Sequence, residues 1–219
     1  MTNRTMADRP DKPLDWLRPR GADWTRGPAR RVHDNPYFAV DIYDAVAPTG
    51  VAGAYYVHQH KNLAVGVVPL HPDGSITLVG QWRFPFSAYS WELPEGGVPP
   101  DEAALDGARR ELREEAGLVG SDWREILRMQ LSNASSDELA IIYLATGFTQ
   151  VETDPDPTEQ LATVRVPFSE ALDAVLSGEI LDSLTVAALL RVHHMASTGA
   201  LPSDLAATVL GSDGNAPGR

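Results

Sequence analysis

Residues 96–118 have the sequence GGVPPDEAALDGARRELREEAGL. Two prolines followed by Asp101, a suitable N-cap residue, predict that a helix begins here. Gly117 predicts where it ends, because glycine readily adopts the left-handed conformation that follows a helix. Between these limits, apolar residues recur every four positions and form an inward stripe: Ala104, Ala108 and Leu112.

Three glutamates share one face of this helix, because Glu111, Glu114 and Glu115 are spaced i, i+3, i+4. Like charges this close destabilise a helix unless cations neutralise them. A patch of hard oxygen ligands suits Mg²⁺ or Mn²⁺ rather than Zn²⁺, and a Mg²⁺ shell also takes up substrate phosphate oxygens. The alternative is a solvated acidic face paired with neighbouring arginines: Arg109, Arg110 and Arg113.

The full spacing favours the metal site. It reads Gly, five residues, Glu, seven residues, Arg-Glu-Leu, one residue, Glu-Glu, one residue, Gly-Leu. This matches the Nudix box at every defined position, a coincidence on the order of 10⁻⁷ per window. The chain therefore resembles a Nudix hydrolase. The resemblance implies an α/β fold, an α/β/α sandwich with a mixed β-sheet, here preceded by an N-terminal β-rich arm.

The resemblance also assigns roles within the box. Glu111, Glu114 and Glu115 resemble the metal ligands, and Glu114 is in addition a candidate catalytic residue. The backbone carbonyl of Glu95, just before the first box glycine, resembles a further ligand. A second pair of box residues is expected to be structural and to hold the loop against the helix: Glu102 and Arg110.

The segments on either side of the box narrow the subfamily. Residues 79–84 and 91–96 resemble the Gln-Tyr-Arg and Glu-Phe-Pro-Ala-Gly segments of ADP-ribose pyrophosphatases. In that resemblance Arg83 contacts the substrate phosphate, and a guanidinium is a bidentate partner for phosphate. The alternative role for Arg83 is an ion pair with Glu92.

Glu138 is the candidate general base. Residues 132–138 stand where those enzymes have a Ser-Pro-Gly loop that ends in a catalytic Glu. This chain lacks the Pro-Gly, so the shape of the loop is open, but the terminal Glu138 is kept. A carboxylate opposite the metals can take a proton from the attacking water. The alternative is an ordinary polar turn.

Aromatic residues near the N-terminus are candidates for substrate binding. The relatives are typically homodimers with exchanged N-terminal segments, whose aromatic residues stack on the adenine. Trp24, Tyr37 and Phe38 are the candidates here, with packing in the core or in a dimer as the alternative. His58 and His60 alternate on a predicted strand, which permits a two-histidine site or an ordinary surface pair.

Charge and composition exclude several functions. The formal net charge of −12 disfavours nucleic acid and anionic membranes as partners. An anionic small-molecule nucleotide would likewise need bridging cations. The absence of cysteine excludes disulfides and thiolate metal sites and fits a cytoplasmic location. No apolar run reaches the roughly 18 residues of a membrane span.

The organisation expected is an arm at 1–36, whose first ten or so residues are poorly ordered, a Nudix domain with N-terminal strands at 37–198, and a tail at 199–219. Val151 to Glu159 is predicted to be a loop, and the chain after Gly211 to be disordered. Strands are predicted at 38–46, 54–60, 63–70, 76–82, 126–131, 139–146 and 162–166, and late helices at 168–176 and 181–195.

The predicted reaction is metal-dependent hydrolysis of the diphosphate bond of a nucleoside diphosphate sugar. ADP-ribose, which would give AMP and ribose 5-phosphate, is the first candidate substrate. Other nucleoside diphosphate derivatives stay open, because the box handles only the diphosphate. A non-catalytic nucleotide-sugar sensor is the alternative from another class, and an intact box with no attached DNA-binding segment disfavours it.

Overall fold

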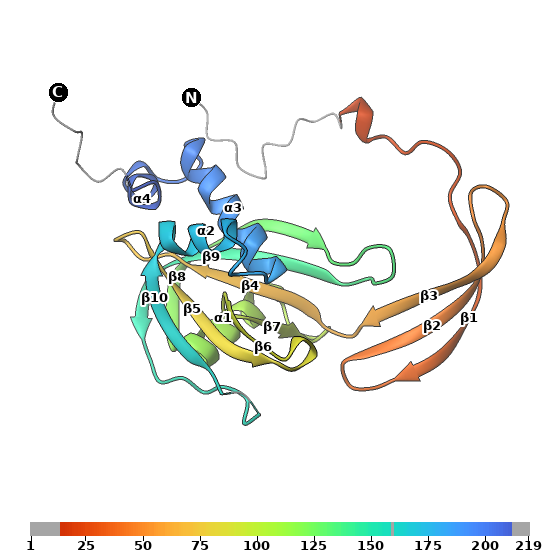
Figure 1. Cartoon of the computed structure of the whole chain (residues 1–219), viewed down its shortest axis with the longest axis horizontal. Coiled ribbons are helices and arrows are strands. Elements are labelled where there is room, and N and C mark those ends of the chain that lie inside the picture. The colour runs from red at the N-terminus through yellow and green to blue at the C-terminus, as the bar shows by residue number, and fades with distance from the viewer. Residues whose placement is uncertain (1–13, 159, 212–219) are drawn as a thin grey trace.

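A computed structural model describes residues 14–158 and 160–211 of the chain (Figure 1). The strands of this part are β1 (Thr25–Asp34), β2 (Phe38–Val46), β3 (Ala52–His60), β4 (Leu63–Pro69), β5 (Ser75–Arg83), β6 (Ala88–Glu92), β7 (Glu95–Val98), β8 (Leu118–Gln130), β9 (Leu139–Gln150) and β10 (Ala162–Pro167). The helices are α1 (Ala104–Ala116), α2 (Phe168–Leu176), α3 (Ser183–Ser197), α4 (Ser203–Val209) and the short 3₁₀ helices η2 (Asp15–Leu17) and η3 (Phe84–Phe86).

A mixed sheet with the strand order β7-β4-β9-β8 lies at the centre of the molecule. β4 runs parallel to β9 and antiparallel to β7, and β8 is antiparallel to β9. Alternate side chains of β4 point to opposite faces, so Val67 packs with α1 whereas Val68 packs with α3. The two helices cover the two faces of the sheet (Figure 1). The predicted α/β/α sandwich is confirmed.

The second sheet, β10-β5-β6, is antiparallel and shares the core beneath α2 and α3. Its β5 begins after the turn at Pro72-Asp73-Gly74, where Gly74 has a φ of +78°. The turn is closed by a bridge between Leu70 and Ile76. β5 and β6 pair with Val79 opposite Glu92, and this pairing brings Glu92 beside the middle of β5.

Helix α1 packs through the predicted stripe, because Ala108 and Leu112 are fully buried. Its N-cap is Ala103 rather than Asp101, and no side chain caps it. The helix ends as predicted at Gly117, whose φ is +63°. A Cβ at Gly117 would also lie 2.7 Å from the carbonyl oxygen of Val151, so the position requires glycine on two counts.

The described part of the arm at residues 1–36 is more regular than expected. β1, β2 and β3 form a separate antiparallel sheet that projects from the main body (Figure 1). All ten residues of β1 are exposed, so this strand has no alternating apolar pattern for the sequence to reveal. Gly27 and Pro28 also interrupt it at a register shift between Arg26 and Ala29.

The C-terminal region differs from the expected tail as well. Residues 203–209 form α4, and its Ala206 and Val209 are buried in the same core as α3. The short strands β6 and β7 were not predicted, and β8 begins at Leu118, well before the expected residue 126. The loop predicted at 151–159 is present over 151–158. The poorly ordered ends predicted at residues 1–10 and after 211 lie outside the described residues.

Candidate active site

The loop before α1 and the helix itself meet through a glutamate and a glycine. A Cβ built on Gly96 would lie 2.3 to 2.5 Å from the carboxylate atoms of Glu111. The carboxylate therefore fills the space that any other residue at position 96 would need. Farther along, a Cβ on Gly107 would meet the side chain of Val98 at 2.3 Å. These two contacts explain why strand β7 and helix α1 pack so closely.

Arg110 binds several carboxylates of the box at once. Its Nε and Nη2 donate to the two carboxylate oxygens of Glu102, at 3.2 and 3.0 Å. Its Nη1 donates to Glu111 at 2.7 Å and to Glu114 at 3.2 Å, and Nη2 also reaches the carbonyl of Gly97 at 3.1 Å. The predicted pairing of Glu102 with Arg110 is confirmed. Hydrogen bonds to these carboxylates raise the pKa of Arg110 further.

Glu115 ties the helix to β7 from the buried side. Only 5% of the residue is exposed, and its Oε2 accepts a 2.9 Å hydrogen bond from the backbone N–H of Glu95. The Glu95 side chain is itself nearly enclosed, and its Oε2 is buried without a hydrogen-bond partner among the described residues. Burial raises the pKa of the Glu95 carboxyl well above its usual range, and the carboxylates of Asp182 and Glu92 add to the rise.

Arg83 lies between these acidic groups. Its Nε donates to both carboxylate oxygens of the buried Glu92 at 3.0 Å, its Nη2 also donates to Glu92, and Nη2 reaches Glu95 at 3.4 Å. The ion pair that the sequence offered as the alternative is therefore present. These bonds raise the pKa of Arg83. The ion pair leaves about a third of the Arg83 side chain exposed (35%). Arg83 also lines a cavity that it shares with Glu115 and Glu138.

One cavity of about 300 Å³ brings together most of the predicted site residues. Glu95, Gly96 and Glu115 line it from β7 and α1, Arg83 from β5, and Glu138 from the end of the β8–β9 connection. Glu138 is about a quarter exposed, and its Oε1 lies 3.5 Å from Nδ1 of His60. Residues far apart in the sequence thus present both acidic and basic groups to one space.

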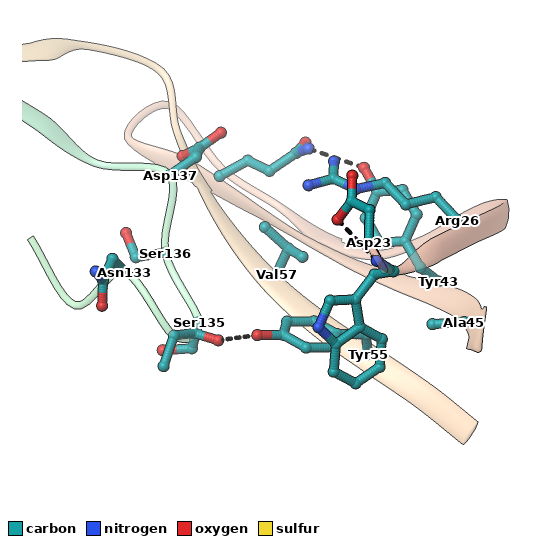
Figure 2. A pocket seen from close by; sticks show the side chains of 13 residues that line it. Asp23, Arg26, Tyr43, Ala45, Tyr55, Val57, Asn133, Ser135, Ser136 and Asp137 are labelled. Carbon is teal, nitrogen blue, oxygen red and sulfur yellow. Dashed lines mark hydrogen bonds between the residues drawn. The ribbon is translucent and has the colours of Figure 1, made fainter. Parts of the chain in front are cut away.

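The N-terminal aromatic residues are divided between two places. Tyr37 lines this cavity and is three-quarters exposed. Trp24 instead lines a second pocket, between the N-terminal sheet and residues 133–137. Figure 2 shows this pocket with Tyr55 on one side and Ser135 on the other. The Trp24 ring meets that of Tyr55 edge to face. Phe38 packs on the ring of His58 at 4.2 Å, in agreement with a packing role.

The chemistry of the donors fits a divalent cation. The box supplies hard carboxylate oxygens, and the buried Oε2 of Glu95 accepts no hydrogen bond from the described residues. Within the described ranges, however, no three His, Cys, Asp or Glu side chains converge as ligands. Arg110 holds Glu111 and Glu114 instead. A cation bound by Glu111 and Glu114 would therefore compete with Arg110 for these two carboxylates.

Comparison with known proteins decides the family. Residues 60–184, more than half of the chain, match the family model of the NUDIX domain. The chain belongs to the Nudix family. Nudix hydrolases are generally dependent on divalent metals, which agrees with the carboxylate chemistry of α1. The predicted family and enzyme class, a pyrophosphohydrolase, are confirmed.

The proteins to which this Nudix protein is similar include a pyrophosphatase and two hydrolases. It is 34% identical to an ADP-ribose pyrophosphatase of Mycobacterium tuberculosis over 182 residues, which is 80% of this chain and 85% of the relative. It is 30% identical to a CMP-5'-(N-acetyl-N-hydroxy-3-aminopropyl)phosphonate hydrolase of Streptomyces rubellomurinus, over 77% of this chain and 82% of that one. A crystal structure of an ADP compounds hydrolase matches the fold, with a TM-score of 0.74, 22% identity and coverage of 84% and 100%.

Sequence reasoning missed several residues of the cavity. Asn62, Leu184 and Gln81 also line it, and Asp182 acts on the Glu95 carboxyl from the N-cap of α3. The contact between His60 and Glu138 was missed too, because the two residues are far apart in the chain. Only the alternation of His58 and His60 gave a signal, since it placed both rings on one side of β3.

No helix in the described part of the chain is long and apolar enough to cross a membrane.

Proposed function

We propose that this Nudix hydrolase cleaves the diphosphate bond of a nucleoside diphosphate sugar, and that ADP-ribose is the substrate that it converts to AMP and ribose 5-phosphate. The observation that carries the proposal is the single cavity shared by Glu115, Arg83 and Glu138. The relative from Mycobacterium tuberculosis, named an ADP-ribose pyrophosphatase, supports the choice of substrate, because the similarity extends over 80% of this chain.

We assign Mg²⁺, or Mn²⁺ in its place, to the carboxylates of Glu111, Glu114 and Glu115 and to the backbone carbonyl of Glu95. Such an ion, when bound, supplies charge to offset the diphosphate and lowers the pKa of a bound water. The tight contact of Glu111 with Gly96 and the buried bond of Glu115 to Glu95 support this assignment, because both fix carboxylates beside the cavity. Glu114 stays a candidate for catalysis as well.

The remaining residues carry the chemical step. Glu138 takes a proton from the attacking water, and the water oxygen bonds to one phosphorus of the diphosphate. The bond between that phosphorus and the bridging oxygen breaks, and the bridging oxygen leaves with the other phosphate. Arg83 offsets the charge on the phosphoryl oxygens. Its bonds to Glu92 are compatible with that role, because they fix the plane of the guanidinium.

Substrate stacking and dimerisation are part of the same proposal. Tyr37 is assigned to stack on the nucleotide at the cavity of its own chain. Trp24 lines a different pocket, so we assign it to the cavity of a partner subunit in a homodimer. Exposed aromatic side chains at the β5–β6 connection offer a surface for such a contact: Trp82, Phe84, Phe86 and Tyr89.

Turnover of a panel of compounds tests the proposal. ADP-ribose, other nucleoside diphosphate sugars, dinucleoside polyphosphates and coenzyme A would each be incubated with Mg²⁺ or Mn²⁺, and the phosphate-containing products quantified. We expect the highest kcat/KM for ADP-ribose. A higher value for a cytidine compound would favour the second candidate, a hydrolase of another nucleotide derivative, which the phosphonate hydrolase relative suggests. Tight binding without product over hours would favour the sensor and contradict the proposal.

A further inference from the structure

The connection between β8 and β9, which carries Glu138, runs alongside strand β3 of the N-terminal sheet. The backbone N–H of His58 donates to the carbonyl of Ser135 at 2.7 Å, and the N–H of Asp137 donates back to the carbonyl of His58 at 3.2 Å. His58 and Ser136 form a parallel bridge at this point. The loop is thus attached to β3 as a short additional strand.

Side chains strengthen this attachment. The hydroxyl of Tyr55 on β3 donates to the carbonyl of Ala134, and Figure 2 shows Tyr55 reaching across to the loop. At the near end of the loop, Ser132 has a φ of +47°, and its carbonyl accepts from the N–H groups of Ser135 and Ser136 at 2.9 and 3.0 Å. A tight turn therefore starts the loop, and β3 holds its remainder.

His60 contacts both of the last two loop residues. Its backbone N–H donates to Oδ1 of Asp137 at 2.8 Å, and its ring Nδ1 lies 3.5 Å from Oε1 of Glu138. The backbone of one residue of β3 thus binds the Asp137 side chain of the loop, and the ring of the same residue faces the Glu138 carboxylate. Both His60 and Glu138 keep about a quarter of their side chains exposed (26%), and both line the cavity.

The His60 ring is itself fixed from the N-terminal sheet. It packs edge to face on the His58 ring at 4.5 Å, and the His58 ring packs in the same way on Phe38 at 4.2 Å. Phe38 is on β2, directly opposite His60 in the β2–β3 pairing. This series of ring contacts gives the imidazole a defined place, which a single exposed histidine on a surface strand would lack.

We propose that His60 and Asp137 are positioning residues, which hold the Glu138 carboxylate toward the cavity and thereby couple the N-terminal sheet to catalysis. The proposal rests on the proposed function, because it takes Glu138 as the base. Asp137 fixes where the loop lies on β3, and an N–H at Nδ1 of His60 steers one carboxylate oxygen. A general base acts only within hydrogen-bond reach of the proton it removes, so a displaced Glu138 should slow the chemical step more than it weakens substrate binding.

The test is steady-state kinetics with ADP-ribose and Mg²⁺ on His60→Ala, His60→Asn and Asp137→Ala. We expect kcat to fall about 10- to 100-fold in the two alanine variants, the scale that misplacement of a catalytic group causes, with KM within about threefold. His60→Asn should recover most of the loss, because its Nδ2 can replace Nδ1 as a donor. His194→Ala, an exposed histidine on α3, is the matched control and should keep the wild-type kcat.

A double-mutant cycle with Glu138→Gln separates positioning from general structural damage. If His60 acts through Glu138, His60→Ala should have no further effect on kcat in the Glu138→Gln background. An equal loss in both backgrounds, or an unchanged kcat in His60→Ala, would overturn the positioning role. A near-normal kcat in Glu138→Gln would instead contradict the base assigned in the proposed function, so the two failures are distinguishable.

Discussion

Helix α1 and the β8–β9 loop both bring glutamates to the same cavity, but they are held by different means. The carboxylates of α1 are fixed within one continuous stretch of sequence. Gly96 leaves space for the Glu111 carboxylate, and Arg110 donates a hydrogen bond to it. Glu138 depends on β3, almost eighty residues earlier in the chain, through contacts such as that between Asp137 and His60. The half of the site that we propose to bind the metal is thus local, whereas the half that carries the proposed base is assembled from distant segments.

This difference suggests that the two halves have separable roles. Damage to α1 should affect cation binding and turnover together. Damage to the loop or to β3 should affect turnover alone, because the carboxylates proposed to bind the cation stay in place. Variants in each half of the site test whether these effects separate.

The largest effects are expected from Glu115→Gln and Glu138→Gln. Glu115→Gln should reduce both Mn²⁺ affinity and kcat, the latter on the order of 10³-fold, because a catalytic metal stabilises the transition state by several kcal/mol. Glu138→Gln should lower kcat about 10²- to 10⁴-fold and leave Mn²⁺ affinity unchanged. Electron paramagnetic resonance titration with Mn²⁺, alongside kinetics, measures both quantities.

The control for both variants is Glu152→Gln, an exposed loop glutamate that should behave as the wild type. Full activity in Glu115→Gln would show that the metal assignment fails. Loss of Mn²⁺ binding in Glu138→Gln would show that the two halves of the site are not separable.

Gly96→Ala should have the next largest effect. The added Cβ would collide with the Glu111 carboxylate at 2.3 to 2.5 Å, so the carboxylate must move away from its place beside the cavity. We expect kcat to fall about 10- to 100-fold and Mn²⁺ affinity to weaken, because small displacements of a fixed group are costly. Gly53→Ala on β3, where the added Cβ meets open space, should change neither quantity. Equal behaviour of the two variants would refute the close-approach argument.

Arg110→Gln should act mainly on stability. The variant loses the bonds to Glu102, Glu111 and Glu114 and removes the positive charge that offsets the repulsion between glutamates on one helix face. Because the guanidinium is about a third exposed (32%), the solvent-screened cost is about 1 to 2 kcal/mol of the free energy of unfolding. Urea unfolding in EDTA measures it, and Mg²⁺ should reduce the deficit by neutralising the same carboxylates. A deficit that Mg²⁺ leaves unchanged would speak against cation binding at these glutamates.

The smallest effect is expected from Tyr55→Phe. The variant removes only the hydroxyl that bonds the carbonyl of Ala134, a neutral hydrogen bond worth about 1 kcal/mol. If that bond helps to position the loop, kcat should fall by up to about fivefold, with Mn²⁺ affinity unchanged. Tyr56→Phe, on the same strand with an exposed side chain, is the matched control. A loss confined to KM would assign Tyr55 to substrate binding instead.

The local half of the site was predictable from the sequence, and the assembled half was not. Fixed spacing along a helix gave the shared face of Glu111, Glu114 and Glu115, and opposite charges in the box gave the pairing of Glu102 with Arg110. Glu138 was found only through resemblance to relatives. Its contact with His60 depends on how a projecting sheet folds back on the β8–β9 loop, and single-sequence periodicity carries no information on such long-range packing.

The fold was likewise predictable only where the sequence carries a local apolar pattern. Buried strands and helices were predicted well, because β4 is a continuous run of mostly buried apolar residues and the buried residues of α2 follow the helical period. Strand β1 was missed because all of its residues are exposed and Gly27 and Pro28 interrupt it. Helix α4 was missed because it is short, and its buried residues Ala206 and Val209 contribute little pattern over two turns.

Product analysis of ADP-ribose hydrolysis is the most direct test of the central claim, that the carboxylates of α1 and Glu138 form one diphosphate-cleaving site. The purified chain would be incubated with ADP-ribose and Mg²⁺, and the products measured by liquid chromatography and mass spectrometry, beside Glu115→Gln and Glu138→Gln. We predict equal amounts of AMP and ribose 5-phosphate from the wild type, none in EDTA, and little from either variant. Intact ADP-ribose after hours with the wild type, or undiminished products from both variants, would contradict the claim.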